Sequence, residues 1–149
     1  MKSSRHKARE LALRALYQQR LSGSNPNELM EMIKTDPEGK KADAGYFESL
    51  IRSIEKNEAE LERMLESCLD REMSVVSPIE RAILLIGAEE LLNNAQIPYR
   101  VVLNEAIELA KRYGGTDGHR FVNGVLDKLA LSTRSVEVAH WKKVQAERQ

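Results

Sequence analysis

The first twenty residues carry the side chains most able to bind a charged ligand. They hold six lysines and arginines against one acid, Glu10, so the segment has a net charge of +5. Arg5 and Arg9 are four residues apart and share one face of a helix, which Leu13 and Tyr17 continue. Two guanidinium groups beside an exposed aromatic ring can clamp phosphates and stack a base. Tyr17 can also be a core residue whose hydroxyl reaches the surface, and the residues alone slightly favour that alternative.

The rest of the chain has the opposite charge. Residues 21–97 hold eight basic and sixteen acidic residues, a balance of −8, although the whole chain has a formal net charge of zero. A basic arm on an acidic body indicates a polyanionic partner and a second, basic partner, and a solvated helix start explains the arm equally well. Single-stranded RNA suits the arm better than duplex DNA, because a major-groove recognition helix follows a tight turn. Here the turn at residues 22–27 comes after the basic helix.

Patterns for catalysis and metal binding are missing from the sequence. The three histidines, His6, His119 and His140, are scattered, and this predicts no zinc site. A nucleophile elbow, a phosphate-binding loop and a dinucleotide fingerprint are absent too. Carboxylate pairs such as Glu89 and Glu90 arise by chance in a chain with 31% charged residues. We therefore expect neither an enzyme nor a bound cofactor.

The single cysteine and the hydropathy pattern bear on the compartment. Cys68 cannot form a disulfide within the chain and falls in an apolar helical pattern, so we expect it to pack in the core in a reducing environment. The basic N-terminus lacks the apolar stretch of a signal peptide. The longest apolar run, Ala82 to Ala88, is far shorter than the roughly 20 residues that cross a bilayer. The expected location is the cytoplasm, with no membrane partner.

Helical periodicity runs through almost the whole chain, and alternating strand patterns are missing. The predicted fold is an all-α bundle of about seven helices, in which an N-terminal group of three packs on a C-terminal group of four. The tail, residues 132–149, can add a last helix. The expected helices are Arg5–Leu21, residues 26–34, one from Asp43 that carries apolar residues to Ile54, one that carries apolar residues from Leu61 to Leu69, Pro78–Asn93, Pro98–Tyr113 and residues 116–131.

The clearest helix start lies at residues 77–80. The Ser77 hydroxyl can accept a hydrogen bond from the backbone N–H of Glu80, and the Glu80 carboxylate can reach back to the N–H of Ser77. Pro78 occupies the first helical position, where no N–H is needed. The helix that follows is apolar on much of its circumference, so we expect it to be central and buried.

Two stretches of the chain resemble the NusB family. The first is the basic segment RHKARELA at residues 5–12, which leads to ALY at residues 15–17. The second, more specific, is PYRVVLNEAIELAK at residues 98–111, which runs on to Tyr113-Gly114, Asp117 and FVNGVLD at residues 121–127. With Glu80-Arg81 and the apolar helix after them, the resemblance covers residues 4–131. It predicts a NusB-like RNA-binding domain over residues 1–131 and a tail of unknown role over residues 132–149.

The resemblance implies a bacterial transcription factor with a seven-helix fold. NusB proteins bind the boxA element of nascent RNA together with a small-subunit ribosomal protein, NusE. That complex helps RNA polymerase read through terminators, notably in ribosomal RNA operons. Carried over residue by residue, the resemblance predicts RNA contacts at Arg5, His6, Lys7, Arg9, Tyr17, Asp117 and Phe121. It predicts the NusE contact at Glu80, and a basic ribosomal protein docking on the acidic body agrees with the charge split.

The chain departs from the family pattern within these segments. His6 and Lys7 stand where consecutive arginines are common; a neutral histidine weakens a phosphate clamp, and lysine lacks the bidentate fork. Gly118 stands where a serine is common, which can loosen the turn on the RNA side. Structural alternatives also stay open for three of these residues. Asp117 can simply favour the positive start of the last helix, and Phe121 can be wholly core. Glu80 can serve as the capping carboxylate.

Other functional classes stay open as well. NusB-like domains occur fused to RNA cytosine methyltransferases, so the chain can be the accessory partner of a separate methyltransferase subunit. It can also be a protein-only adaptor or a homodimer, with the basic face buried against another subunit. For the leading RNA-binding hypothesis, we expect Arg9→Ala to weaken RNA binding by about 1–3 kcal/mol, through loss of a charged hydrogen bond.

Overall fold

The computed structural model describes residues 3–148, and its regular elements are all helices. They are α1 (Ser4–Ser22), α2 (Pro26–Thr35), α3 (Ala44–Glu66), α4 (Pro78–Asn93), α5 (Tyr99–Tyr113), α6 (Gly118–Thr133) and α7 (Ser135–Glu147). Two short 3-10 helices, η1 (Pro37–Lys41) and η2 (Met73–Val75), precede α3 and α4. The predicted all-α fold is confirmed over the described residues.

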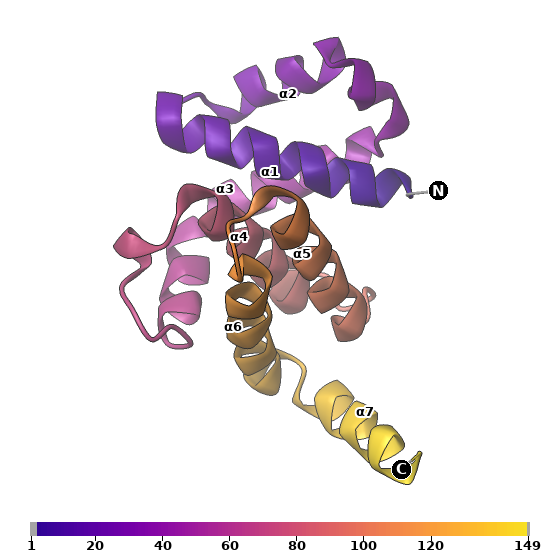
Figure 1. The fold of residues 1–149 in the computed structure, drawn as a ribbon. Helices are drawn as coiled ribbons and strands as arrows, with labels where there is room; N and C mark the ends of the chain where they lie inside the picture. The colour runs from indigo at the N-terminus through magenta and orange to yellow at the C-terminus, as the bar shows by residue number, and fades with distance from the viewer. Residues whose placement is uncertain (1–2, 149) are drawn as a thin grey trace.

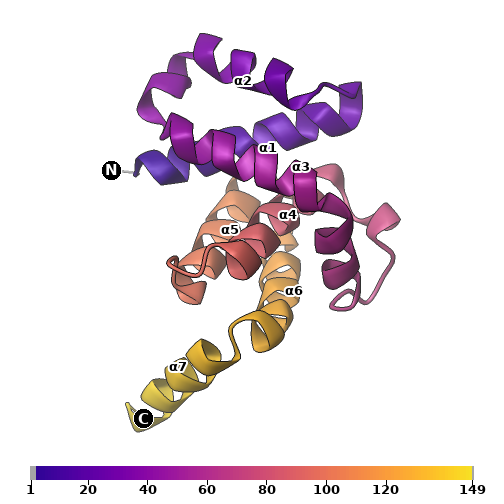
Figure 2. The ribbon, with the colours of Figure 1, turned by 180° about the vertical axis from the view of Figure 1, so that it is seen from behind.

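The helices form two groups (Figure 1). α1, α2 and α3 pack together, and α4, α5 and α6 pack together beneath them in that view. α4 lies in the middle, because it contacts α1 and α3 on one side and α5 and α6 on the other. α7 follows the far end of α6 and extends away from the bundle, as both views show (Figures 1 and 2). The N-terminal group of three is as predicted, and among the four remaining helices α7 takes the place of the helix expected from Leu61 to Leu69.

The prediction of two separate helices between residues 43 and 69 is wrong. A single helix, α3, spans 23 residues there. Ile54 and Leu61 are seven residues apart, which is close to two helical turns, so both project from the same face, and both are buried. The polar residues between them include no glycine or proline, so nothing ends the helix. The total stays at seven because the tail forms α7, as the sequence allowed.

Side-chain caps fix the helix starts. The Asp43 carboxylate accepts the backbone N–H of Tyr46 at 2.9 Å, and the Ser77 hydroxyl oxygen accepts that of Glu80 at 3.2 Å. The return half of the predicted capping box differs. Oε2 of Glu80 accepts from the Ser77 hydroxyl at 3.0 Å rather than from its backbone N–H. The predicted start of α4 is nevertheless confirmed.

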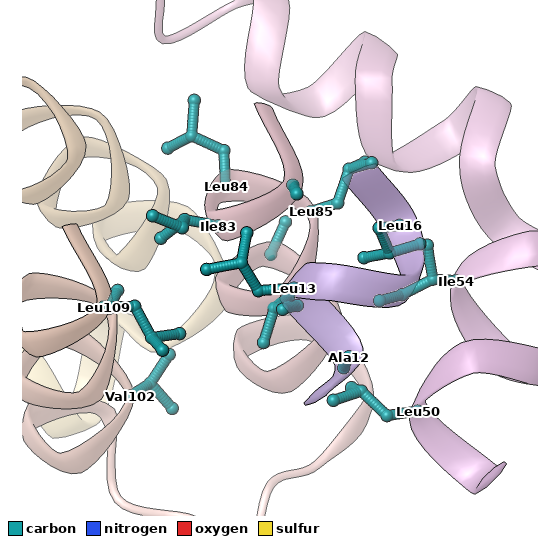
Figure 3. Packing of buried hydrophobic residues seen from close by; sticks show 14 of the residues in the cluster. Ala12, Leu13, Leu16, Leu50, Ile54, Ile83, Leu84, Leu85, Val102 and Leu109 are labelled. Carbon is teal, nitrogen blue, oxygen red and sulfur yellow. The ribbon is translucent and has the colours of Figure 1, made fainter. Parts of the chain in front are cut away.

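α4 is the centre of the core, as its apolar circumference predicted. Its residues are buried continuously from Arg81 to Leu91. α1 contributes to both groups of helices, as Figure 3 shows: Leu13 points towards Ile83, Leu85, Val102 and Leu109, while Ala12 and Leu16 lie beside Leu50 and Ile54 of α3. Gly87 lets α6 approach closely, because a Cβ at that position would lie 2.6 Å from Cδ1 of Leu126. Burial of these apolar surfaces holds the two groups together.

The tail is anchored through a buried arginine, Arg134. Its guanidinium donates four hydrogen bonds of 2.8–3.0 Å to the backbone carbonyls of Glu90, Leu91, Asn94 and Ile97. A fifth goes to Glu137 at 2.8 Å, and the other oxygen of Glu137 accepts the N–H of Tyr99 at 2.6 Å. The last carbonyls of a helix have no partner within it. Arg134 therefore caps the end of α4, while Glu137 caps the start of α5.

Candidate nucleic-acid interface

Arg5 is the most exposed of the α1 side chains predicted to contact RNA. Its side chain is 46% exposed. The guanidinium lies 4.6 Å from the centroid of the Tyr46 ring, and Nε lies 4.0 Å from Oδ2 of Asp43. The backbone N–H of Asp43 donates to the carbonyl of Ser4 at 3.0 Å, which ties the starts of α1 and α3 together. Arg5 thus presents an accessible cation at the junction of two helices.

Arg9 lies one turn further along α1 and points into the protein. It is 3% exposed, and its Nε donates to Oε2 of Glu90 at 2.7 Å. The hydroxyl of Tyr46 donates to the same oxygen. The expectation of one exposed face carrying both Arg5 and Arg9 is wrong. α1 packs on α4, and both Arg9 and Leu13 are buried. Loss of the Arg9 side chain would therefore leave the buried Glu90 carboxylate without its cation.

Burial governs the electrostatics of this cluster. It raises the pKa of Glu90 above the ordinary carboxyl range, although Arg9 and the Tyr46 hydroxyl favour the charged form. Burial and the neighbouring Glu90 also raise the pKa of Tyr46 well above that of a free tyrosine, so its hydroxyl stays a donor. Burial acts to lower the pKa of Arg9, but Glu90 outweighs it and raises that pKa.

His6 is buried between α1 and α5. Its Nδ1 lies 2.6 Å from Oε2 of Glu105, and its Nε2 lies 2.9 Å from Oε1 of Glu10. Both ring nitrogens are therefore engaged by carboxylates, one from α1 and one from α5. The resemblance implies an RNA contact at His6, but the ring is buried at the seam between the two helices. It joins α1 to α5 there.

Further cations at the same seam hold Glu10. Nζ of Lys7 lies 3.5 Å from Glu10 and 3.3 Å from Glu38, and Nη1 of Arg112 donates to Glu10 at 3.1 Å. Burial acts to raise the pKa of Glu10, but Lys7, Arg112 and His6 together lower it below the ordinary value. Lys7 is half-buried and Arg112 is exposed. Lys7 on α1 and Arg112 on α5 therefore both reach the surface, while the Glu10 carboxylate beneath them stays ionised.

Tyr17 lies three turns after Arg5 on α1. It is half-buried and is not part of the core cluster that Leu13 and Leu16 join. The alternative of a core tyrosine is therefore not supported. The residue is partly accessible, as a stacking role requires.

Asp117 forms the turn between α5 and α6. It is the one non-glycine residue with positive φ among residues 3–148, at φ 63°, and its side chain makes no capping hydrogen bond. It is exposed, with Nε of Arg120 3.7 Å from Oδ1. Because Arg112 in the last turn of α5 contacts Glu10, this turn begins beside α1. A left-handed conformation costs energy in a residue with a Cβ, and such positions cluster at functional sites.

Phe121 lies one turn into α6 with one side against the core. The Arg71 guanidinium lies 4.5 Å from its ring centroid. The ring borders a groove of about 250 Å³ lined by Cys68, Asp70, Arg120, Phe121, Gly124, Val125 and Lys128. Phe121 is thus half-buried rather than wholly core, and the groove combines an aromatic wall with cations. That combination suits an unstacked base and its phosphate.

Glu80 adjoins this region from the first turn of α4. Its Oε1 lies 3.5 Å from the position that a Cβ of Gly118 would take. Its other oxygen is engaged by Ser77, so capping and a partner contact can use different oxygens. The distance also leaves ordinary contact space for a side chain at Gly118, so close packing does not demand a glycine there. The residue predicted to contact NusE therefore lies next to the turn predicted to contact RNA.

Sequence reasoning missed the residues that hold the seam from beneath. Glu90 and Glu105 pair with α1 across 81 and 99 positions of the chain, and Tyr46 joins α3 to the same cluster. One signal was present. Glu89 and Glu90 interrupt an otherwise apolar helix, and a buried carboxylate requires hydrogen-bonding partners. Those partners lie too far away in sequence for spacing to reveal them.

Within residues 3–148, no helix has the length and apolar content needed to span a bilayer. The same residues contain no cluster of three or more histidine, cysteine, aspartate or glutamate side chains suited to a metal ion. Cys68 is half-buried and packs against the core cluster, so its predicted packing role is confirmed.

The comparison with known proteins agrees with the all-helical fold. The sequence model of the NusB family matches residues 6–131. Transcription antitermination protein NusB of Thiobacillus denitrificans is 46% identical over 143 residues, which cover 96% of this chain and 99% of that protein. That of Azoarcus sp. is 51% identical over 136 residues, covering 91% and 88%.

Solved structures give the same result for the fold. T. maritima NusB superposes with a TM-score of 0.76 at 30% identity, covering 87% of this chain and 92% of that one. A crystal structure of antitermination factors NusB and NusE in complex with dsRNA superposes with a TM-score of 0.76 at 26% identity, covering 89% and 99%. These relatives are transcription antitermination factors, which agrees with the expectation that the chain is not an enzyme. The chain therefore belongs to the NusB family.

Proposed function

We propose that this protein is a cytoplasmic transcription antitermination factor that binds boxA-type RNA together with the ribosomal protein NusE. In this role it joins the RNA polymerase antitermination complex and supports transcription of ribosomal RNA operons. The observation that carries the proposal is the adjacency of Glu80 to the Asp117 turn, because one continuous surface can then take both partners. Residues 1–131 form the RNA-binding domain in this proposal, and the tail, residues 132–149, supports it through Arg134 and Glu137 at the C-terminal end of α4.

The RNA surface in this proposal is the exposed side of the α1–α5 seam. Arg5 and Lys7 supply phosphate contacts, and Tyr17 supplies an aromatic face. Asp117 and Phe121 extend the surface to the start of α6. His6 and Arg9 contribute from beneath, by holding α1 on α5 and α4.

The NusE surface in this proposal is the acidic body around Glu80. Ribosomal proteins are basic, and charge complementarity speeds association and fixes orientation. A basic partner on this side adds positive charge next to the RNA turn. That addition explains physically why NusE should tighten RNA binding rather than compete with it.

The form of the RNA is the point to test first. The basic arm suits single-stranded RNA, whereas the related NusB–NusE structure contains dsRNA. We would titrate the protein into fluorescent boxA-like RNA, single-stranded and as a duplex, with and without NusE at two salt concentrations. Selective single-strand binding that NusE tightens and salt weakens supports the proposal. Binding that ignores RNA sequence and NusE contradicts it and favours a protein-only adaptor, for which sedimentation at twice 16.9 kDa is the corresponding sign.

Asp117 offers a sharper test of the surface. Glycine adopts a left-handed conformation without the Cβ penalty, so Asp117→Gly should raise the free energy of unfolding slightly, by about 0.5 kcal/mol. The same change should weaken RNA binding, because the predicted contact is lost. Urea unfolding and the RNA titration measure the two effects, with the exposed Asp127→Asn on α6 as a control that should leave both unchanged. Unaltered RNA affinity in Asp117→Gly would remove this turn from the interface.

A further inference from the structure

Arg5 is exposed, yet α3 fixes its position. Its guanidinium lies over the Tyr46 ring, 4.6 Å from the centroid, with the Asp43 carboxylate 4.0 Å away. Lys7, the other accessible cation of the first turns, is held instead by Glu10 and Glu38. A cation–π contact engages the side of the guanidinium that faces the ring, so the N–H groups that point away from the ring stay available to an anion.

Tyr46 is itself anchored at both ends. Its backbone N–H donates to Oδ1 of Asp43 at 2.9 Å, and its hydroxyl donates to Oε2 of Glu90, which is 1% exposed and also accepts from Arg9. Only 8% of Tyr46 is exposed, and that ring lies under Arg5. A chain of contacts therefore runs from the core carboxylate through a fixed ring to a surface cation.

We propose that Tyr46 is a positioning residue for RNA binding, whose ring holds the Arg5 guanidinium ready for a phosphate. The inference rests on the proposed RNA-binding function. An arginine that moves freely loses rotamer freedom when it binds a phosphate, and one that is already stacked loses less. Tyr46 thus acts through Arg5, without touching the RNA.

A double-mutant cycle tests this, read by anisotropy with boxA-like RNA and NusE. Arg5→Ala should weaken binding about tenfold, as loss of a charged hydrogen bond does. Tyr46→Leu should weaken it about five- to tenfold, because the ring is lost while the site stays apolar. The double variant should bind within about twofold of Arg5→Ala, because the ring has nothing left to position. The dependence of RNA affinity on salt should become shallower in both Arg5→Ala and Tyr46→Leu. The magnitude of the slope of log affinity against log salt should fall by about 1 or less in each.

A conservative variant separates positioning from folding. Tyr46→Phe keeps the ring but removes the donor to Glu90, so it should lower the free energy of unfolding and change RNA affinity less than about twofold. Arg100→Ala is the matched control, because Arg100 lies 4.3 Å from the Trp141 ring centroid beside α7 and outside the proposed RNA surface. It should leave RNA affinity unchanged.

An NMR measurement on the free protein needs no variant of Tyr46 to fold. The Arg5 Nε–H resonance, assigned by its absence in Arg5→Ala, should be shifted upfield by the ring beneath it. An unshifted resonance overturns the proposal. So does a double variant that binds RNA about fiftyfold or more weakly than wild type, because the two substitutions would then act independently. A wild-type protein that binds no boxA RNA overturns the proposed function and this role together, even with the shift present. Normal RNA binding with an unshifted resonance overturns the role of Tyr46 alone.

Discussion

Two buried arginines fasten helices to α4, and they do so with different partners. Arg9 joins α1 to α4 through the carboxylate of Glu90, whereas Arg134 joins α7 to α4 through four backbone carbonyls. Removing Arg9 strands a charge, and a second substitution can remove that charge in turn. Removing Arg134 strands backbone acceptors, which no substitution can delete. The junction of α1 with α4, the N-terminal seam, can therefore tolerate a paired substitution of Arg9 and Glu90. The junction of α7 with α4, the C-terminal corner, depends on Arg134 alone.

The largest expected effect breaks the C-terminal corner. Arg134→Ala should lower the free energy of unfolding by about 3–5 kcal/mol, because buried carbonyls lose their donor and α7 loses its anchor. Urea denaturation monitored by the single tryptophan, Trp141, and by circular dichroism measures it. The control is Arg148→Ala, at the exposed C-terminal cap of α7, which should stay within about 0.5 kcal/mol of wild type. A loss below about 1 kcal/mol for Arg134→Ala would mean that water replaces the guanidinium, and the contrast with Arg9 would disappear.

The next effect breaks the N-terminal seam and then repairs it. Arg9→Ala should lower the free energy of unfolding by about 3 kcal/mol, because Glu90 is left buried without its cation. The pair Arg9→Met with Glu90→Gln should recover most of that loss, since Met fills the space and Gln still accepts from Tyr46. Failure of this rescue would show that the ion pair itself is needed. RNA affinity should fall less in folded Arg9→Ala than in Arg5→Ala, in contrast to the sequence-based expectation for Arg9.

The smallest effect concerns Glu89, the neighbour of Glu90. Glu89 is 1% exposed, but it has neutral partners, including Asn93 at 2.9 Å. Burial raises its pKa, although hydrogen bonds from Asn93, Asn57 and Ser53 favour the charged form. A carboxyl with a higher pKa in the folded state binds its proton more tightly there. Its ionisation therefore costs stability as pH rises from the unfolded-state pKa to the folded-state pKa, and the full cost persists above that.

Glu89→Gln should accordingly raise the free energy of unfolding at about pH 8, by about 1 kcal/mol. The gain over wild type should shrink as the pH falls and be smallest below about 4, where the carboxyl becomes protonated in both states. Urea unfolding at several pH values tests this, with the exposed Glu108→Gln as the control. A gain that does not vary with pH would mean that packing, and not charge, limits stability at this position.

The elements of the fold were largely predictable because their signals are local. Helical periodicity and caps at Asp43 and Ser77 act within a few residues, and the structure has these helix starts. The break expected between Ile54 and Leu61 was wrong because a polar stretch of two turns leaves the buried face in phase. The site was less predictable. The spacing of Arg5 and Arg9 identified a shared side of α1 but not how deeply each position lies.

By itself, the sequence determined a helical chain with a buried α4, a basic first helix and a NusB-type C-terminal block. Each of these depends on residue types at short spacings. Only the tertiary structure decided which cations remain accessible, because partners that bury them come from distant parts of the chain. Glu105 lies 99 residues from His6, Glu90 lies 81 residues from Arg9, and the carbonyl of Ile97 lies 37 residues from Arg134. A charge looks the same in sequence whether it faces water or a buried partner. Its burial is set by how α1 and α7 pack on α4 and α5, and that packing is a property of the whole fold.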